Sequence, residues 1–368
     1  MSALAAKPDR VLVVVLRRLG DVLLTTPLLR SLRRGLPGAS IDVLVFAGTE
    51  GMLAGNPDID NVIAMPQRSS PVQALALVRR LWRRYDLAIT TQTGDRPTFL
   101  AWLAGRRRIG LAPDAGQGGW WKRRALHRAV AGEPEGHRVV ELLRIASALG
   151  LAPQPELVPP TAPSSGEAPA RGRYAVLHAN PMFRYKRWTD AGWRGLARAL
   201  AERGLQVIAT GGPDPAERTY LDGLWNEMPR VERVDGKLGW PELTALLRGA
   251  AVYVGTDTSM THLAAAAGCP TVALYGPVSP QRIGPWPVGG LGEMWAAAGT
   301  IQRRGNVWVV QNPLPCLPCE KLGCEGHLDS HAQCLDELGV RQVLVAVDQA
   351  LGGVAPGGVA SARTSTGQ

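Results

Sequence analysis

The chain has 368 residues, of which 45% are hydrophobic and 20% are charged. This length predicts two domains, and the composition excludes a disordered chain, which would hold fewer apolar and more charged residues. The formal net charge is +10, and nearly all of it lies in residues 1–160, where 22 Lys and Arg face 13 Asp and Glu. A basic half favours a polyanionic partner, which could be nucleic acid, anionic lipid or an acidic sugar; solubility alone is the alternative.

The apolar runs are too short for a membrane helix or a signal peptide. The first, residues 11–16, is far below the ~18 apolar residues that span a bilayer, and arginines bound it on both sides. We therefore expect a cytoplasmic protein, with cysteines that are thiols or metal ligands rather than structural disulfides.

Residues 1–160 alternate between strand-like and helical patterns. Buried apolar runs predict strands at 11–16, 41–46 and 87–90, and helical spacing predicts helices at 28–36, 74–85 and 138–149. Repetition of this kind predicts a doubly wound parallel sheet with right-handed crossovers. Thr25, Thr26 and Pro27 predict either a helix start or a helix kinked at Pro27.

The same pattern resumes after a segment rich in Pro, Ala, Ser and Gly, within which we place an interdomain linker at 161–173. Strands are predicted at 174–178, 206–210, 251–254 and 271–275, and helices at 193–203, 241–248, 258–267 and 341–351. Residues 174–351 therefore form a second α/β domain, although the final helix could alternatively return to the first. The tail, 352–368, is expected to be disordered.

Two such domains leave a cleft between them, and ligands of open parallel sheets bind outside the carboxyl ends of the strands. The first candidates follow the first strand, where Arg17 and Arg18 precede Leu-Gly20-Asp21. Gly20 permits a tight turn, and Asp21 could act as a general base on a hydroxyl group. A helix N-cap is the alternative role for Asp21.

A second candidate is the segment Gly255-Thr-Asp257-Thr258-Ser259-Met-Thr-His262. Its small residues and hydroxyl groups open a helix whose free amide groups could bind phosphate, with Asp257 as the cap and His262 as a further donor. An ordinary capped helix with a structural His262 is the alternative. The chain has neither a Walker loop nor a G-x-G-x-x-G turn, which argues against an ATPase and a dinucleotide oxidoreductase.

Two further loops follow predicted strands. Lys186 lies in the segment NPMFRYKRW, residues 180–188, and could neutralise a leaving diphosphate. A solvated loop charge is the alternative. Gly212 and Glu217 follow the strand at 206–210, and the carboxylate there could accept hydrogen bonds from ribose hydroxyl groups.

Four cysteines gather near the C-terminus with the spacing C-x2-C-x4-C-x9-C: Cys316, Cys319, Cys324 and Cys334. The first pair suits zinc, but the later spacings match no standard zinc module. Unligated thiols are the preferred interpretation, with zinc, a disulfide or an iron–sulfur site as alternatives.

Arginine and lysine also occur in compact groups. We interpret Arg79, Arg80, Arg83 and Arg84 as a solvated helix face. The other groups lie in what we predict to be a mobile substrate loop that contacts an anionic acceptor: Arg106, Arg107 and Arg108, and then Lys122, Arg123 and Arg124.

Several of these segments resemble the lipopolysaccharide heptosyltransferases of glycosyltransferase family 9. The resemblance rests on VLVVVLRRLGDVLLTTP at 11–27, LHANPMFRYKRW at 177–188 and GTDTSMTH at 255–262. The stretch IDVLVFAGTEGMLAGNPDID at 41–60 is most similar to the branch called heptosyltransferase III. The resemblance covers roughly residues 10–350 in order.

The family implies a GT-B fold, in which two Rossmann-like domains with doubly wound parallel sheets face a cleft. The N-terminal domain would bind a lipid A–Kdo core acceptor, and the C-terminal domain would bind ADP-heptose. The reaction would invert the anomeric centre without a metal ion or another cofactor. The enzyme would work on the anionic inner face of the inner membrane.

The resemblance also implies roles for single residues. Asp21 would deprotonate the acceptor, Lys186 would stabilise the diphosphate, Thr258 and Ser259 would hold phosphate, and Asp257 would hold sugar hydroxyls. The donor site would further include Gly20, Asn180, Gly212, Glu217 near ribose, Leu238 near adenine, and His262. The acceptor site would include Arg17, Arg18, Arg106, Arg107, Arg108, Lys122 and Arg123.

Three alternatives stay open at this point. The same fold could use another nucleotide sugar, or the chain could bind a sugar without catalysis. A basic nucleic-acid-binding protein is the alternative from a different class, but the arginines are not interleaved with aromatic residues on a repeated surface and no module motif is present. We therefore expect no nucleic-acid partner.

Overall fold

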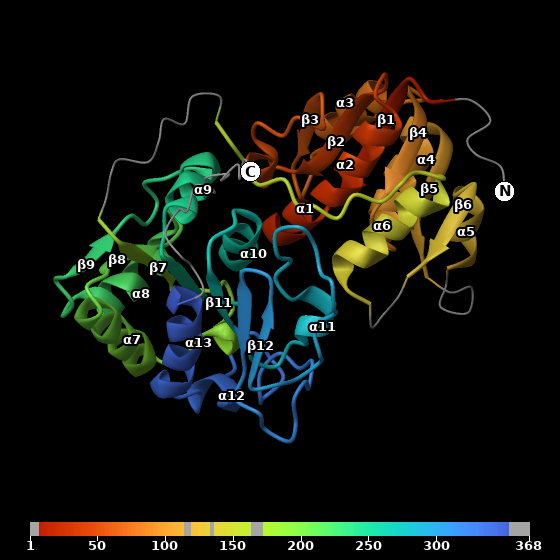
Figure 1. Ribbon diagram of the computed structural model, residues 1–368. Coiled ribbons are helices and arrows are strands. Elements are labelled where there is room, and N and C mark those ends of the chain that lie inside the picture. The colour runs from red at the N-terminus through yellow and green to blue at the C-terminus, as the bar shows by residue number, and fades with distance from the viewer. Residues whose placement is uncertain (1–6, 114–118, 133–135, 163–171, 353–368) are drawn as a thin grey trace, which may run out of the picture.

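The computed structural model describes residues 7–113, 119–132, 136–162 and 172–352. They form two parallel sheets, each with helices on both faces, that lie beside one another (Figure 1). The predicted GT-B type of fold, two doubly wound α/β domains, is confirmed. Within the described residues, no helix combines the length and apolar character that crossing a membrane requires.

The first sheet has six parallel strands in the order β3-β2-β1-β4-β5-β6. Their bounds are β1 Arg10–Val15, β2 Ser40–Phe46, β3 Asn61–Met65, β4 Tyr85–Thr90, β5 Gly105–Ala112 and β6 Arg128–Ala131. The order reverses between β1 and β4, and in open sheets this reversal is where ligands bind. The residues that follow β1 therefore occupy the most probable ligand position of this domain.

Helices cover both faces because β1 is apolar on both of its sides. Val11, Val13 and Val15 belong to one core cluster, and Leu12 and Val14 belong to the other. The first cluster packs against α1 Leu19–Leu24, α2 Thr26–Gly35 and α6 Arg138–Ala148. The opposite side carries α3 Pro71–Leu81, α4 Asp95–Ala104 and α5 Trp120–Ala125, with α4 in contact with both of its neighbours.

The second sheet repeats the same winding in the order β12-β13-β11-β10-β7-β8-β9, with only the edge strand β12 antiparallel. The strands are β7 Tyr174–His178, β8 Gln206–Thr210, β9 Val231–Arg233, β10 Val252–Thr256, β11 Thr271–Leu274, β12 Ile301–Arg304 and β13 Val307–Val310. Its helices are α7 Asp190–Glu202, α8 Pro215–Trp225, α9 Trp240–Arg248, α10 Ser259–Ala266, α11 Pro280–Ile283, α12 Gln333–Asp336 and α13 Val340–Gly352. Here the order reverses between β7 and β10.

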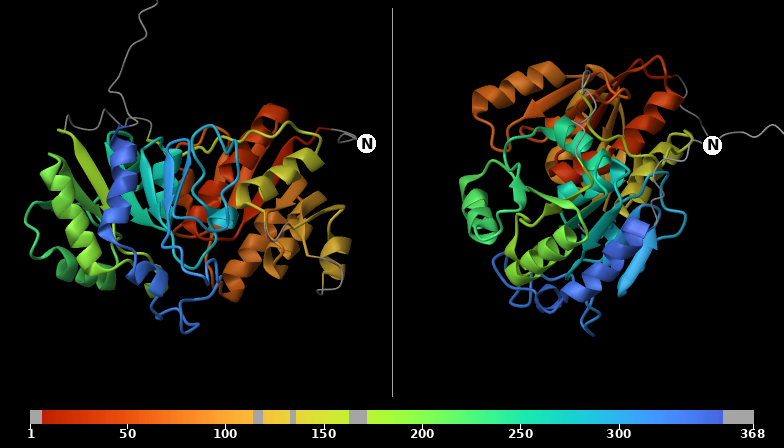
Figure 2. Two further views of the ribbon diagram at one scale, coloured as in Figure 1. Left: turned by 60° about the horizontal axis from the view of Figure 1, so that its bottom comes forward. Right: turned by 60° about the vertical axis from the view of Figure 1, so that its left-hand side comes forward.

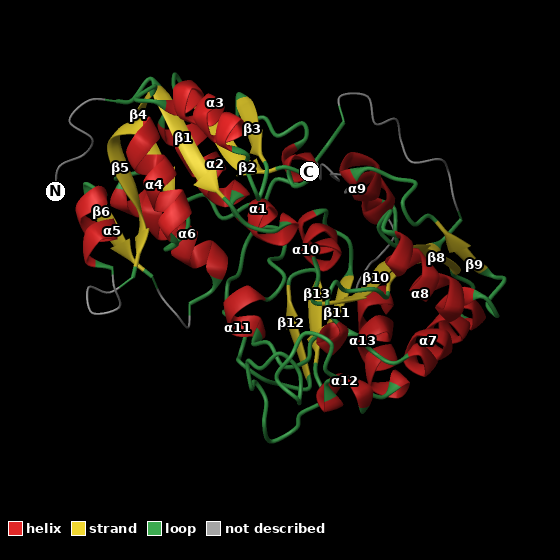
Figure 3. Cartoon of the chain, turned by 180° about the vertical axis from the view of Figure 1, so that it is seen from behind, coloured by secondary structure: helices red, strands yellow, loops and turns green. Residues whose placement is uncertain are grey.

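The two domains share a packed interface, and the left view of Figure 2 shows them side by side. One core cluster runs from Val22 and Leu23 of α1 to Met260 and Leu263 of α10. Helices α1 and α10 are in direct contact there, as the view from behind in Figure 3 also shows. This contact brings the helix that follows β1 against the helix that follows β10.

Hydrogen bonds of two aromatic side chains, His137 and Trp286, extend the interface. The imidazole of His137, at the start of α6, accepts a hydrogen bond from the amide of Val139 at 3.2 Å and donates through Nε2 to the carbonyl of Gly284 at 2.9 Å. The indole of Trp286 donates to the carbonyl of Pro155 at 2.7 Å. Because Gly284 and Trp286 belong to the second domain, these bonds connect the two domains directly.

Several local predictions need correction. Arg106, Arg107 and Arg108 lie in strand β5, and Lys122, Arg123 and Arg124 lie in helix α5, so the predicted substrate loop is wrong for both groups. These two elements were not predicted because their repeated arginine and lysine residues leave few apolar residues to show a strand or helix pattern. Helix α13 packs on α7, β10, β11 and β13, so its return to the first domain is also wrong.

The helix start predicted at Thr26 and Pro27 is confirmed, because α1 ends at Leu24 and Pro27 occupies the first turn of α2. Residues 149–162 form no helix or strand and lie along the first domain, where the amide of Val158 donates to Thr26 Oγ1 at 2.9 Å. Most of the predicted linker and almost all of the predicted tail lie outside the described residues.

Candidate active site between the two domains

Asp21 lies at the carboxyl end of β1, in the first turn of α1. Arg18 is the N-cap of this helix, so the alternative role of Asp21 as the cap is wrong. The carboxylate keeps 27% of its side-chain surface exposed, and its Oδ1 lies 3.7 Å from Nε of Arg138. Asp21 is therefore held near a cation but stays accessible to a ligand.

Arg138 is a residue that sequence analysis missed. Its guanidinium donates to the carbonyl of Thr91 and to Glu141 Oε2, both at 2.6 Å, which fixes its orientation. Its Nε is buried and has no hydrogen-bond partner within the described part of the chain. Because it comes 117 positions after Asp21 in the sequence, at the start of another helix, no local pattern could have paired the two.

Asp257 follows β10 and is buried, with 7% of its side chain exposed. Thr258 is the N-cap of α10, so the prediction that Asp257 caps this helix is wrong. Asp257 Oδ2 instead accepts from Nζ of Lys186 at 2.5 Å, and Asp257 Oδ1 accepts from the hydroxyl of Tyr275 at 3.4 Å. Tyr275 was not predicted as a site residue, although it follows β11 at the same edge of the sheet.

The ion pair with Asp257 keeps Lys186 positively charged. Burial alone would lower the pKa of Lys186, but the neighbouring Asp257 carboxylate outweighs burial and raises this pKa above its ordinary value. Lys186 is therefore a fixed cation at neutral pH rather than a solvated loop charge. It lies in the 3-10 turn Arg184–Lys186 that follows β7.

Helix α10 begins at Ser259, directly after Asp257 and Thr258. The amide groups of a first helical turn have no partner within the helix and carry the positive end of its dipole. His262 lies in the same helix, buried, and its Nε2 is 3.9 Å from Asp257 Oδ1. Burial lowers the pKa of His262, although the carboxylates of Asp257 and Asp21 act in the opposite direction.

The two halves of the site meet at Gly20. A methyl group added at Gly20 would come 3.4 Å from Cδ2 of His262 and 3.8 Å from Cα of Ser259. Beside this contact, the guanidinium of Arg18 lies 4.6 Å from the ring centre of Phe183. Gly20 and Arg18 precede Asp21 in the first domain, whereas their partners Ser259, His262 and Phe183 lie in the candidate phosphate-binding segments of the second domain.

Some buried polar atoms without hydrogen-bond partners lie at this junction. Of the thirteen such atoms in the described residues, four are Oδ1 of Asn180, Oγ1 of Thr256, Nδ1 of His262 and Nε of Arg138. Such atoms are costly in a folded protein unless a ligand or water satisfies them. Their presence here favours a polar ligand between the domains.

The remaining donor-site candidates lie at the same edge of the second sheet. Glu217 is half-buried, and its Oε2 would lie 2.5 Å from a methyl group placed on Gly212, so its carboxylate rests on the Gly211–Gly212 turn after β8. Asp214 caps α8 by accepting from the amides of Ala216 and Glu217. Leu238 precedes α9 and packs partly against the core that both domains share.

The predicted acceptor residues divide between two regions. Arg17 and Arg18 are exposed next to Asp21. Lys122 is paired with Asp95 Oδ1 at 2.8 Å, and Arg123 donates to the carbonyl of Pro113 at 2.9 Å. Asp95 follows the carboxyl end of β4, and Pro113 follows that of β5.

The second region is remote from Asp21. Arg107 pairs in register with Leu87, and Leu87 pairs with Val11 at the start of β1. Arg106, Arg107 and Arg108 therefore lie toward the amino ends of the strands, at the edge of the sheet opposite to Asp21. This position argues against contact with a substrate in the cleft.

The cysteine group is close in space but is not arranged as a metal site. Among the described residues, no three His, Cys, Asp or Glu side chains are placed to hold a metal ion, and all five cysteines are free. Burial, together with the nearby Cys319, Cys324 and Cys316, raises the pKa of Cys334 to about 12. Cys334 is thus a protonated thiol at neutral pH.

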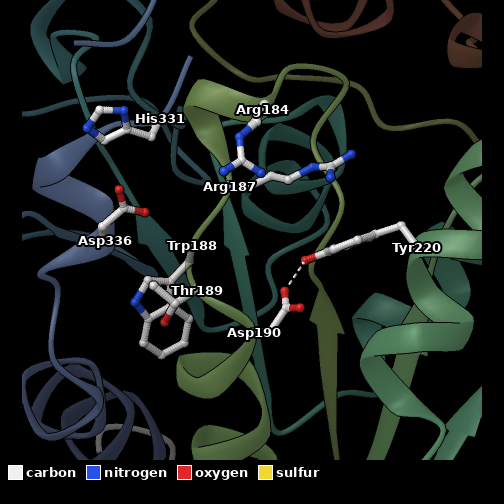
Figure 4. Close-up of a pocket in the computed structure, with 8 residues that line it drawn as sticks. All are labelled: Arg184, Arg187, Trp188, Thr189, Asp190, Tyr220, His331 and Asp336. Carbon is white, nitrogen blue, oxygen red and sulfur yellow. Dashed lines mark hydrogen bonds between the residues drawn. The ribbon is translucent and has the colours of Figure 1, made fainter. Parts of the chain in front are cut away.

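A cavity of about 430 Å³ borders the loop that carries Lys186 (Figure 4). Arg184 and Arg187 enter it from the loop, and the guanidinium of Arg187 lies 4.3 Å from the ring centre of Tyr220. Asp190 and Asp336 also line it, and Asp190 accepts from the Tyr220 hydroxyl at 2.9 Å. The walls carry both signs of charge, and neither Lys186 nor Asp257 is among them, so we treat this cavity as separate from the Asp21–Asp257 site.

Comparison with known proteins gives a consistent result. Residues 74–289 match the model of the family described as glycosyltransferase family 9 (heptosyltransferase). The chain is 30% identical over 333 residues to lipopolysaccharide heptosyltransferase 1 of Pseudomonas aeruginosa, covering 86% of this chain and 87% of that protein. It is 28% identical over 287 residues to lipopolysaccharide heptosyltransferase 3 of Escherichia coli, covering 73% and 83%.

A solved structure gives the same fold. An Escherichia coli heptosyltransferase crystallised with ADP superposes with a TM-score of 0.71 at 23% identity, covering 93% of this chain and 99% of that one.

Proposed function

Because the chain belongs to glycosyltransferase family 9, the heptosyltransferase family, we propose that it transfers heptose from ADP-heptose to the inner core of lipopolysaccharide. The transfer is a single displacement that inverts the anomeric carbon and needs no metal ion. The acceptor is a lipid A–Kdo core saccharide, and the reaction takes place at the cytoplasmic face of the inner membrane. One relative, solved both with ADP and with ADP-2-deoxy-2-fluoro heptose, supports the donor.

Asp21 acts as the general base. As the acceptor oxygen attacks the anomeric carbon, its proton passes to the Asp21 carboxylate, and the bond between that carbon and the diphosphate oxygen breaks. The half-exposed carboxylate is available for this role because its cation, Arg138, stands at 3.7 Å rather than in a close ion pair. A positioned base typically accelerates such a step by ~10²–10⁴-fold.

Lys186 and the start of α10 stabilise the departing ADP, which leaves with the bonding electron pair. Lys186 supplies a permanent positive charge, and the amides after Thr258 supply fixed donors. Asp257 holds Lys186 in place and offers its other oxygen to sugar hydroxyls. Fixed donors at developing charge contribute ~3–4 kcal/mol each in well-studied sites.

The observation that carries the proposal is the contact of Gly20 with Ser259 and His262, because it brings the start of α1, which carries Asp21, next to the start of α10, which follows Asp257 and Thr258. Holding both substrates there converts a bimolecular step into a local one, which can supply ~7–11 kcal/mol. The buried polar atoms without partners at the same place support a polar ligand.

The test is an assay of the purified protein with ADP-heptose and a series of truncated core acceptors, with products read by mass spectrometry. We expect addition of one heptose to an inner-core acceptor and release of ADP. Another nucleotide sugar is the main competing donor. If UDP- or GDP-sugars release their nucleotide faster than ADP-heptose does, the proposed donor is wrong.

A further inference from the structure

The outer face of the first domain carries an unusual concentration of exposed apolar side chains. We call the surface formed by α3, α4 and α5 the outer face; it covers the side of the first sheet opposite to α1, α2 and α6. Its exposed large apolar residues are Val72, Leu75, Trp82, Phe99, Trp102 and Trp120. Six of the twelve large hydrophobic side chains exposed in the described residues thus belong to one surface.

Helix α3 is the clearest part of this surface. Its sequence is PVQALALVRRL, yet within the helix only Leu81 is buried. Val72 is 77% exposed and Leu75 is 51% exposed. Leu77, Val78 and Leu81 pack against the core, as expected of a surface helix, whereas Val72 and Leu75 have no apolar partner there.

Aromatic rings continue the surface on α4 and α5. Phe99 and Trp102 lie one turn apart on α4 and stack with their ring centres 5.9 Å apart. Trp120, at the start of α5, is 64% exposed. Indole rings with one face in solvent are typical of segments that sit at the boundary between lipid and water.

The charge of this surface is entirely of one sign in three long segments. Residues 71–84, 96–112 and 119–131 each hold four Lys or Arg and no Asp or Glu. In the described part of the chain, no carboxylate lies within 4.0 Å of Arg79, Arg80, Arg83 or Arg84.

Three further contacts show what lies beside these three basic segments. The turn at Arg83 lies against the end of α4, since its amide donates to the carbonyl of Leu103. Asp86 and Asp95 are the neighbouring acids, at 3.9 Å from Arg106 and 2.8 Å from Lys122. The basic residues therefore border the exposed apolar residues with few opposing charges.

We propose that the outer face binds the surface of an anionic lipid bilayer, with α3 and the tryptophans entering the headgroup region and the arginines contacting lipid phosphates. Apolar side chains beside unpaired cations are the combination that such a surface recognises. A second copy of the chain fits less well, because joining two outer faces would bring like charges together. A nucleic-acid backbone would match the charge but would leave Val72 and Leu75 without an apolar partner.

This inference also gives Arg106, Arg107 and Arg108 a role that their position at the amino ends of the strands allows. It fits the proposed lipid-linked acceptor and rests on that function for its biological setting. The surface argument itself depends only on the exposed residues, and the test below measures binding without sugar transfer.

The test is flotation of the full-length protein with vesicles of 30% phosphatidylglycerol and 70% phosphatidylethanolamine, compared with vesicles of phosphatidylcholine alone. We expect binding to the first and little binding to the second, and at least a tenfold loss at 0.5 M NaCl. The apolar variant is Val72→Ser with Leu75→Ser, and the charge variant is Arg79→Gln with Arg80→Gln. Each should weaken binding to anionic vesicles by at least tenfold.

Matched controls lie on the second domain. Val345→Ser on α13 and Arg198→Gln on α7 change exposed residues of the same types and should leave vesicle binding within twofold. Transfer to a soluble, lipid-free core acceptor should be unchanged in all of these variants, which separates this proposal from the proposed reaction.

Two results would overturn the proposal. One is equal flotation of the wild type and both outer-face variants with anionic vesicles. The other is a dimer, seen by light scattering, that the Val72→Ser, Leu75→Ser variant dissociates, because the outer face would then be covered by a second copy.

Discussion

Asp21 and Asp257 both lie beside the reversal of strand order in their sheets, but their surroundings differ. Each carboxylate follows a strand that borders the reversal of strand order in its sheet. Asp257 is buried and holds Lys186 at 2.5 Å, whereas Asp21 is 27% exposed and faces Arg138 at 3.7 Å. One carboxylate is therefore committed to fixing a cation, and the other is left available to a substrate. In the proposed mechanism, one residue type therefore fixes a cation in one domain and acts as the base in the other.

Removing the Asp21 carboxylate should have the largest effect on turnover. For Asp21→Asn we expect turnover to fall by about 10²–10⁴-fold, because the acceptor loses its base, while the melting temperature stays nearly constant. ADP release with ADP-heptose and a core acceptor measures the first, and thermal unfolding measures the second. Glu202→Gln, an exposed carboxylate on α7, is the control. Near-normal turnover of Asp21→Asn would remove it as the base.

For the Asp257–Lys186 ion pair we expect a loss of stability instead. Lys186→Met leaves Asp257 buried without its cation, which should lower the free energy of unfolding by about 3–5 kcal/mol. The double variant Lys186→Met, Asp257→Asn should recover most of that loss because no charge is left unpaired. Urea unfolding of both variants measures the difference. Equal destabilisation of the single and double variants would show that the ion pair is not the cause.

Two buried histidines predict a dependence of stability on pH. Burial lowers the pKa of His137 and of His178 to about 4, so both are neutral in the folded protein. The unfolded chain takes up these protons near pH 6.5, so the stability present above pH 6.5 is lost as the pH falls toward 4. Each site contributes roughly 2–4 kcal/mol to this loss.

Urea unfolding at several pH values tests this dependence, with His137→Gln as the variant. The difference between wild type and variant should change across pH 6.5–4. A constant difference would contradict the role of His137, whose ring connects α6 to Gly284.

Arg138 should give the smallest effect, because it acts through Asp21 as a positioning residue. For Arg138→Gln we expect kcat to fall about tenfold, since the carboxylate loses its neighbouring cation, which helps to position it, while the KM for ADP-heptose stays within twofold. Arg138→Lys should recover part of kcat. A rise in KM with constant kcat would instead assign Arg138 to donor binding.

The fold was predictable because its signals are local. The continuous apolar run at 11–16 and the strand at 174–178 specify strands that are buried on both faces, and the order of elements then specifies the winding. The same logic placed Asp21, Lys186 and Asp257 at strand ends that face the cleft. In the first sheet, β3, β5 and β6 escaped prediction. Three arginines follow Gly105 at the start of β5, and β3 and β6 are short edge strands.

The details of the site were less predictable because they depend on contacts between distant segments. Both aspartates looked like helix caps, yet Arg18 and Thr258 occupy the cap positions. The choice is made by Arg138 and Lys186, which are brought to the aspartates by tertiary packing. Tyr275 could have been found, since it follows a strand at the same edge of the sheet.

The division of work between the two domains is tested most directly by calorimetric titration of ADP into the wild type, Asp21→Asn and Lys186→Met, at a temperature where all three are folded. We predict that Asp21→Asn binds ADP within about twofold of the wild type, and that Lys186→Met binds it about ten- to a hundredfold more weakly, the loss of one charge-assisted contact. Equal affinities for all three proteins, or weaker binding by Asp21→Asn than by Lys186→Met, would contradict the account.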